Sequence, residues 1–219
     1  MLSSVVPRAD FKVDQFDALI DQKGFNTLWM QSMFCSCYDL STGQPEYTCK
    51  VCKGKGYVYL DPVKTKVVVS SISGNKVQET VGLQDIGHAL LTSKSNEFIG
   101  FRDKFIFPEF TCKFSEVLIK GEDFLKYEAK KILFLQYKGL FLKNGIDFKI
   151  SSEDYQTILW SSDVINDEEQ YSVLYLTSPV YLVTGIAHEL RATYHLTEGN
   201  LEKFVELPKQ YSIKREDIL

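Results

Sequence analysis

Four cysteines within residues 35–52 constrain this chain more than any other feature of its sequence. Cys35 and Cys37 form a first pair, eleven residues follow, and Cys49 and Cys52 form a second pair. Two such pairs in one short polar segment are typical of a structural zinc site, in which four thiolates complete a tetrahedron and leave no position for water. The pattern therefore predicts that these four cysteines bind one structural Zn²⁺. The first pair is separated by one residue rather than two, which tightens its turn without preventing chelation.

The residues on either side of the cysteines predict a zinc ribbon. An apolar stretch without helical period, residues 25–34, leads into the first pair, and residues 57–60 follow the second pair. Gly54 and Gly56 come directly after Cys52, and glycine tolerates the dihedral angles needed when backbone amides turn toward thiolate sulfurs. Strand, knuckle, loop, knuckle and strand is the layout of a ribbon.

The rest of the chain predicts a mainly β protein, with a β-barrel or sandwich body, one short N-terminal helix and the small ribbon. Residues 10–23 place apolar side chains at helical spacing, and Gly24 ends the pattern. Many short β-rich stretches separated by turn signals argue for a sandwich or barrel. We expect strands near residues 63–72, 76–81, 86–92, 100–107, 130–137, 147–150, 155–160, 171–177, 180–184, 186–196 and 204–207.

Three regions are expected along the chain. Residues 1–61 hold the helix and the four-cysteine zinc ribbon, residues 62–208 form the barrel or sandwich, and residues 209–219 form a polar, loose C-terminal tail. The boundary near residue 61 lies at Asp61-Pro62, a turn signal. A module of ribbon size buries too little apolar surface to fold unaided, and a structural metal can supply that deficit.

Composition narrows the function classes. A hydrophobic share of 44% and a net charge of −4 over 219 residues are those of a globular protein and argue against a general nucleic-acid coat. No apolar run approaches the roughly 20 residues that span a bilayer, and residues 1–8 lack the apolar core of a signal peptide. We expect a cytoplasmic protein without a membrane partner, in which clustered cysteines bind metal. The fifth cysteine, Cys112, is expected to be a small buried hydrophobe.

The sequence gives no positive evidence for an enzyme, and no catalytic residue is predicted. His188-Glu189 begins a metalloprotease motif, but the second histidine would stand at position 192, which is Ala192. His88, His188 and His195 are expected to be strand residues with local partners. Carboxylates gather at turns, where solvated loop charges are the usual interpretation.

The cysteine segment, followed by a second spaced pattern, resembles a group of tailed-bacteriophage virion proteins. The first part is Cys35-Ser-Cys37, then Ser41-Thr-Gly-Gln-Pro45 and Cys49-Lys-Val-Cys52-Lys-Gly54-Lys-Gly56. The second part is Asn144-Gly-Ile-Asp-Phe148, Ile158-Leu-Trp160, Tyr171-Ser-Val-Leu-Tyr175, Pro179, Tyr181-Leu-Val183, His188 and Arg191.

This resemblance implies a ring-forming head–tail connector of the neck: an adaptor, stopper or tail-terminator. The implied partners are copies of the chain itself, the neighbouring portal, neck and tail proteins, and double-stranded DNA in transit. The implied location is the virion, assembled in the host cytoplasm. An acidic channel would let DNA slide, because like charges repel phosphates. Residues 107–128 and the tail are the segments expected to reach neighbouring subunits by strand addition.

A zinc-ribbon nucleic-acid-binding protein is the alternative function. Lys50, Lys53, Lys55, Lys64 and Lys66 lie in or near the ribbon, close in sequence to two tyrosines. Basic residues interleaved with aromatic rings can bind nucleic acid. The lysines can equally serve to solvate a small exposed module.

Overall fold

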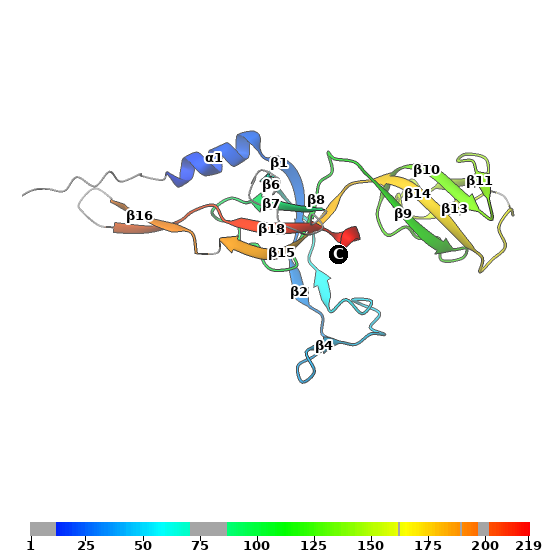
Figure 1. Cartoon of the computed structure of the whole chain (residues 1–219), viewed down its shortest axis with the longest axis horizontal. Coiled ribbons are helices and arrows are strands. Elements are labelled where there is room, and N and C mark those ends of the chain that lie inside the picture. Colours follow the sequence, from blue (N-terminus) through cyan, green and yellow to red (C-terminus); the bar gives the residue numbers. More distant parts are fainter. Residues whose placement is uncertain (1–11, 71–86, 162, 189, 197–201) are drawn as a thin grey trace, which may run out of the picture. The chain divides into compact units, whose positions relative to one another are not determined.

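The structure is a computed structural model and describes residues 12–70, 87–161, 163–188, 190–196 and 202–219 (Figure 1). The predicted mainly β class, with its short helix and ribbon-like segment, is confirmed. The elements are α1 (Val13–Lys23), β1 (Phe25–Met30), β2 (Ser32–Phe34), β3 (Tyr38–Asp39), β4 (Gln44–Pro45), β5 (Tyr57–Tyr59), β6 (Val63–Ser70), β7 (His88–Thr92), β8 (Lys104–Ile106), β9 (Cys112–Ile119), β10 (Ala129–Tyr137), β11 (Leu140–Leu142), β12 (Phe148–Ile150), β13 (Ile158–Trp160), β14 (Gln170–Thr177), β15 (Val180–His188), β16 (Ala192–Leu196), β17 (Glu202–Glu206), β18 (Gln210–Arg215) and the 3₁₀ helix η2 (Glu216–Ile218).

The chain forms two compact units, residues 1–105 with 181–219, and residues 106–180. The first unit is built on a closed barrel with the strand order β1-β6-β7-β18-β15-β8. Closure removes free strand edges, so every barrel strand has two neighbours. Strands distant in sequence therefore become adjacent: β18, near the C-terminus, pairs with β7 and with β15.

Apolar side chains that alternate along the strands fill the interior of the barrel. Val67, Leu91, Phe105, Val183 and Ile213 are each fully buried, and they come from five different barrel strands. Successive side chains of a strand point to opposite faces, so one residue in two enters the core.

Helix α1 is attached to the barrel by polar contacts at its second turn. The Asp17 carboxylate accepts hydrogen bonds from the Ser95 backbone N–H at 3.0 Å and the Ser95 hydroxyl at 2.6 Å, and Lys94 Nζ lies 2.6 Å from Asp21. The helix ends where expected, at Gly24, whose backbone N–H donates to the Ile20 carbonyl. A Cβ at Gly24 would stand 2.4 Å from that carbonyl oxygen, so only glycine fits this close approach.

The second unit, residues 106–180, contains a four-stranded sheet in the order β11-β10-β14-β9 and the hairpin β12–β13. Its core is formed by apolar side chains from one face of the sheet and from the hairpin, among them Leu135, Phe148, Ile158 and Val173. The two ends of this unit lie close together in space, because the Phe107 backbone N–H donates to the Pro179 carbonyl at 3.1 Å. Residues 106–180 therefore form an insertion between β8 and β15.

The division into units differs from the predicted regions. The structure does not separate residues 1–61 from a single body over residues 62–208: the ribbon and the barrel belong to one unit, and residues 106–180 form the other. β18 pairs with β7, and β15 is the neighbour of β8, so strands from the C-terminal part of the chain complete the barrel. Local sequence patterns do not indicate this strand pairing.

One predicted segment has a different structure. Residues 209–219 were expected to be a loose polar tail, but β18 lies inside the barrel sheet, with Tyr211 and Ile213 buried. Residues 107–128, which are expected to reach neighbouring subunits, contain β9, which pairs along its whole length with β14 and is the edge strand of its sheet. The strand expected over residues 76–81 lies outside the described residues. Within the described ranges, no helix has the length and apolar character needed to cross a membrane.

Candidate metal centre

The ribbon is built on two short antiparallel strands, β2 and β5, with Phe34 opposite Tyr57. Cys35 and Cys37 follow β2 directly. Cys49 and Cys52 lie in the turns that precede β5. The Cys35 backbone N–H donates to the Gly56 carbonyl at 2.8 Å, which holds the two cysteine segments side by side.

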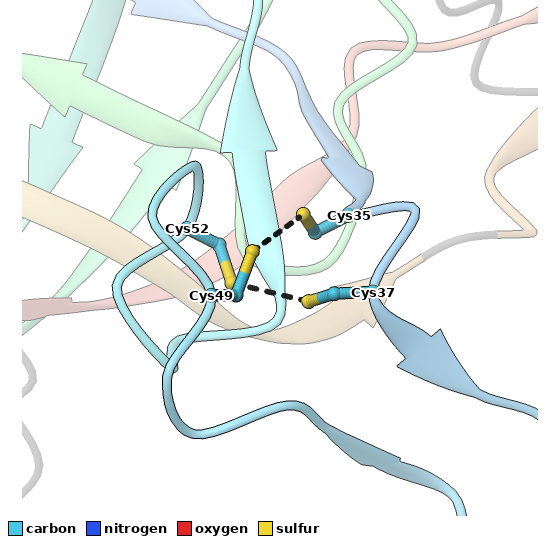
Figure 2. Close-up of side chains that lie close together, drawn as sticks. All are labelled: Cys35, Cys37, Cys49 and Cys52. Atoms are coloured by element: carbon cyan, nitrogen blue, oxygen red, sulfur yellow. Dashed lines mark hydrogen bonds between the residues drawn. The ribbon is translucent and has the colours of Figure 1, made fainter.

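All four cysteine side chains converge on one point, as Figure 2 shows. The Sγ atoms of Cys35 and Cys49 are 3.8 Å apart, those of Cys37 and Cys52 are 3.4 Å apart, and all four Sγ atoms lie within 4.8 Å of one another. A tetrahedral site with metal–sulfur distances of about 2.3 Å requires sulfur–sulfur separations of about 3.8 Å. The cluster therefore has the size of a four-thiolate metal site.

The backbone after the second cysteine pair is strained in the way that a knuckle requires. Lys53, Gly54 and Gly56 all have positive φ, at 52°, 77° and 79°. A Cβ at Gly54 would lie 3.0 Å from the Tyr47 carbonyl oxygen, and one at Gly56 would lie 3.1 Å from the Pro45 ring. Both glycines are thus required for their dihedral angles and for space, as their place in the sequence indicated.

Burial and the neighbouring thiols shift the pKa values of two of the cysteines. Burial raises the pKa of Cys37 to about 12, and hydrogen bonds with the Cys52, Cys49 and Cys35 thiols act in the same direction. Burial also raises the pKa of Cys52, but the backbone of Gly56 and the thiols of Cys37, Cys49 and Cys35 outweigh that effect and lower it to about 7. In such a cluster, hydrogen bonds from neighbouring thiols stabilise a thiolate on one sulfur. Four crowded sulfurs of this kind favour a bound cation.

The ribbon is fixed to the barrel at its base. The Ser32 backbone N–H and hydroxyl donate to the buried Asp103 carboxylate at 2.8 and 3.1 Å. Lys55 Nζ lies 3.6 Å from the Glu216 carboxylate, which Lys104 approaches at 3.4 Å. Lys104 also lies over the ring of Tyr59, 4.2 Å from its centroid. These contacts support the hairpin that ends in the four-cysteine cluster.

The fifth cysteine and the three histidines lie in four different strands. Cys112 lies in β9 opposite Thr177 and is half-buried. His88 is in β7, His188 ends β15 and His195 is in β16. Within the part of the chain that the structure describes, the four cysteines are the one group of three or more His, Cys, Asp or Glu residues placed to hold a metal ion. The sequence prediction of these four residues as neighbours agrees with the geometry.

A search of known protein families and of curated proteins finds no match to this chain.

Proposed function

We propose that this chain is a structural subunit of a tailed-phage virion, a ring-forming head–tail connector whose ribbon is held by one structural Zn²⁺. The proposed partners are copies of the chain in a ring, the neighbouring portal, neck and tail proteins, and double-stranded DNA in transit. The proposed location is the virion, assembled in the host cytoplasm. We assign the protein no catalytic role.

One observation carries this proposal: large apolar side chains are exposed on paired strands while both cores are filled. Tyr194 and Phe204 on β16 and β17 are 57% and 55% exposed, and Phe34 on β2 is 57% exposed. Such positions on short hairpins are costly in an isolated protein and are typical of surfaces that other subunits cover. An assembly subunit accounts for them, whereas a free-standing binding module does not need them.

Zinc is the metal that the donor set favours. Four thiolates without oxygen or nitrogen ligands suit a soft or borderline cation in a closed tetrahedral site, and zinc is the usual occupant. All four positions would be taken by Cys35, Cys37, Cys49 and Cys52. The role of such a metal is to hold the ribbon in shape, since no position remains for a substrate or for water.

The alternative, nucleic-acid binding by the ribbon, is disfavoured by charge. Over residues 31–66, which include all five lysines, Asp39, Glu46 and Asp61 leave a net charge of +2. Four thiolates around one divalent cation contribute −2, so the loaded segment would carry no net charge. Phosphate contacts supply most of the affinity of nonspecific binding, and an uncharged module lacks that attraction.

Four measurements test the proposal. Immunogold labelling and mass spectrometry of virus particles produced from the genome that encodes this chain are expected to find the protein at the neck, and metal analysis of cleanly purified protein is expected to find one zinc per chain. Particles that lack the protein would contradict the virion role. In a fluorescence titration with duplex DNA, tight binding with a steep salt dependence would favour the nucleic-acid-binding alternative.

A further inference from the structure

The hairpin β16–β17 presents an aromatic pair that nothing in the described part of its own chain covers. Tyr194 and Phe204 are directly opposite each other in the antiparallel register, and their rings meet edge to face with centroids 5.5 Å apart. More than half of each side chain is exposed. The two strands pair with each other and form a separate two-stranded sheet. Because a lone two-stranded hairpin is marginally stable in water, these rings need an external surface.

The same chain carries an apolar groove between α1 and the barrel. Phe16, Leu19 and Ile20 of α1 line one side, and Val68, Leu207 and Pro208 lie opposite. Its volume is about 160 Å³. An apolar cavity of about 150 Å³ accommodates a benzene-sized ring. The groove is thus sized for one aromatic side chain, and Leu19 at its rim is half exposed.

The groove has a charged side that suits an aromatic ring. Arg191 lines it, and its Nη1 donates to the Pro208 carbonyl at 3.3 Å. The Leu207 backbone N–H donates to the Arg191 carbonyl at 2.9 Å, which fixes both segments at the base of the hairpin. A guanidinium held at the edge of an apolar groove can lie over an incoming ring and interact with its π face.

A hairpin cannot fill the groove at its own base. Tyr194 is three residues beyond Arg191, and Phe204 is three residues before Leu207. Three residues of extended strand span about 10 Å, so the aromatic pair lies well away from the groove that flanks the hairpin. The groove and the pair are therefore two different surfaces of one chain.

We propose that one ring of the Tyr194–Phe204 pair of one copy docks into the α1–barrel groove of the next copy. This inference rests on the proposed ring-forming function, which it makes specific. A contact between two different patches is head-to-tail, and it closes into a ring when the rotation between copies permits. A large aromatic side chain in a desolvated groove is also the usual centre of binding energy at an interface.

Sedimentation velocity of the unmodified chain and four variants tests the docking. Leu19→Glu places a charge in the groove, and the double variant Tyr194→Ser/Phe204→Ser removes the aromatic pair. Gln22→Glu adds the same charge at an exposed position of α1, and Leu190→Ser removes an apolar side chain that is 99% exposed near the hairpin. Oligomers of the unmodified chain are expected to be lost in the first two variants and retained in both controls. Circular dichroism melting checks that each variant is folded.

Mixing the two defective variants tests the head-to-tail geometry. Leu19→Glu keeps an intact hairpin, and the double variant keeps an intact groove, so one productive contact remains between them. Dimers that do not grow further are expected. Absence of dimers in the mixture would overturn head-to-tail docking.

Other outcomes separate the docking from the proposed function. Oligomers that persist in both defective variants would overturn the docking while leaving a ring-forming role intact. An unmodified chain that stays monomeric at its highest soluble concentration would also overturn the docking, and the virion role would then be decided by labelling of the particles.

Discussion

The indole N–H of Trp29 donates a hydrogen bond of 2.8 Å to the carboxylate of Asp103. Asp103 is 2% exposed, and the backbone N–H groups of Ser32 and Gly100 donate to the same carboxylate at 2.8 and 2.9 Å. Trp29 lies at the end of β1, Ser32 begins β2, and Asp103 precedes β8. One buried carboxylate therefore joins the first barrel strand, the base of the ribbon and the turn that leads into the last strand of the barrel order.

Replacing Asp103 is expected to destabilise the first unit. Asp103→Ala leaves several buried donors without an acceptor, and each unsatisfied group costs about 1–3 kcal/mol. We expect a loss of about 3 kcal/mol in the free energy of unfolding, since relaxation and water entry recover part of the total. Urea unfolding followed by tryptophan fluorescence measures it. Asp61→Ala, at an exposed position, is the control, and equal stability of the two variants would contradict the anchoring role.

Replacing one ligand is expected to release the metal and weaken the ribbon. Cys49→Ser or Cys52→Ser removes a thiolate from the cluster and, because the ribbon depends on the metal for its shape, lowers stability and assembly. Mass spectrometry of the metal content and thermal unfolding measure both effects. Cys112→Ser is the matched control, as it removes the cysteine outside the cluster. Full zinc content in Cys49→Ser would show that the cluster is not the binding site.

Local patterns predicted the ribbon and the helix because their determinants are local. The cysteine spacing, Gly54 and Gly56 act within a few residues, and Gly24 ends α1 through contact with its own last turn. Strands β14 and β15 were predicted from their long apolar runs. In β18, Tyr211 and Ile213 alternate with polar residues, which is the pattern of a half-buried strand. The many polar residues of this segment instead favour the prediction of a polar tail.

Contacts between residues far apart in the sequence could not be predicted from local patterns. No sequence signal indicates that residues 106–180 form an insertion, because the hydrogen bond between Phe107 and Pro179 joins positions far apart in the chain. The sequence predicts a strand over residues 100–107, and that prediction does not indicate that Asp103 accepts hydrogen bonds from several donors. The α1–barrel groove also depends on tertiary structure, since Leu19 and Leu207 come from opposite ends of the sequence.

Substituting Gly54 tests whether steric space or only backbone dihedrals fix the knuckle. Gly54→Ala is expected to lower the unfolding temperature and zinc affinity, because Gly54 has φ of 77° and an added Cβ would lie 3.0 Å from the Tyr47 carbonyl oxygen. Gly145→Ala is the matched control: its φ is 86°, with nothing within 4 Å of the added atom. A positive φ alone costs about 1–2 kcal/mol. Gly54→Ala is expected to cost more than the control, and equal costs would mean that the contact with Tyr47 is unimportant.

Acid is expected to weaken the second unit through Glu169. Hydrogen bonds from Lys138 and from the Tyr137 hydroxyl lower the pKa of Glu169 from 4.5 to about 2. Below about pH 4.5 the unfolded chain therefore binds more protons at this carboxyl than the folded chain, so the stability that Glu169 contributes falls as the pH drops from about 4.5 toward 2. Urea unfolding at a series of pH values is expected to give a shallower acid dependence for Glu169→Gln than for the unmodified chain. Glu153→Gln, at an exposed turn, controls for the loss of one carboxyl, and an unchanged slope in Glu169→Gln would rule out this contribution.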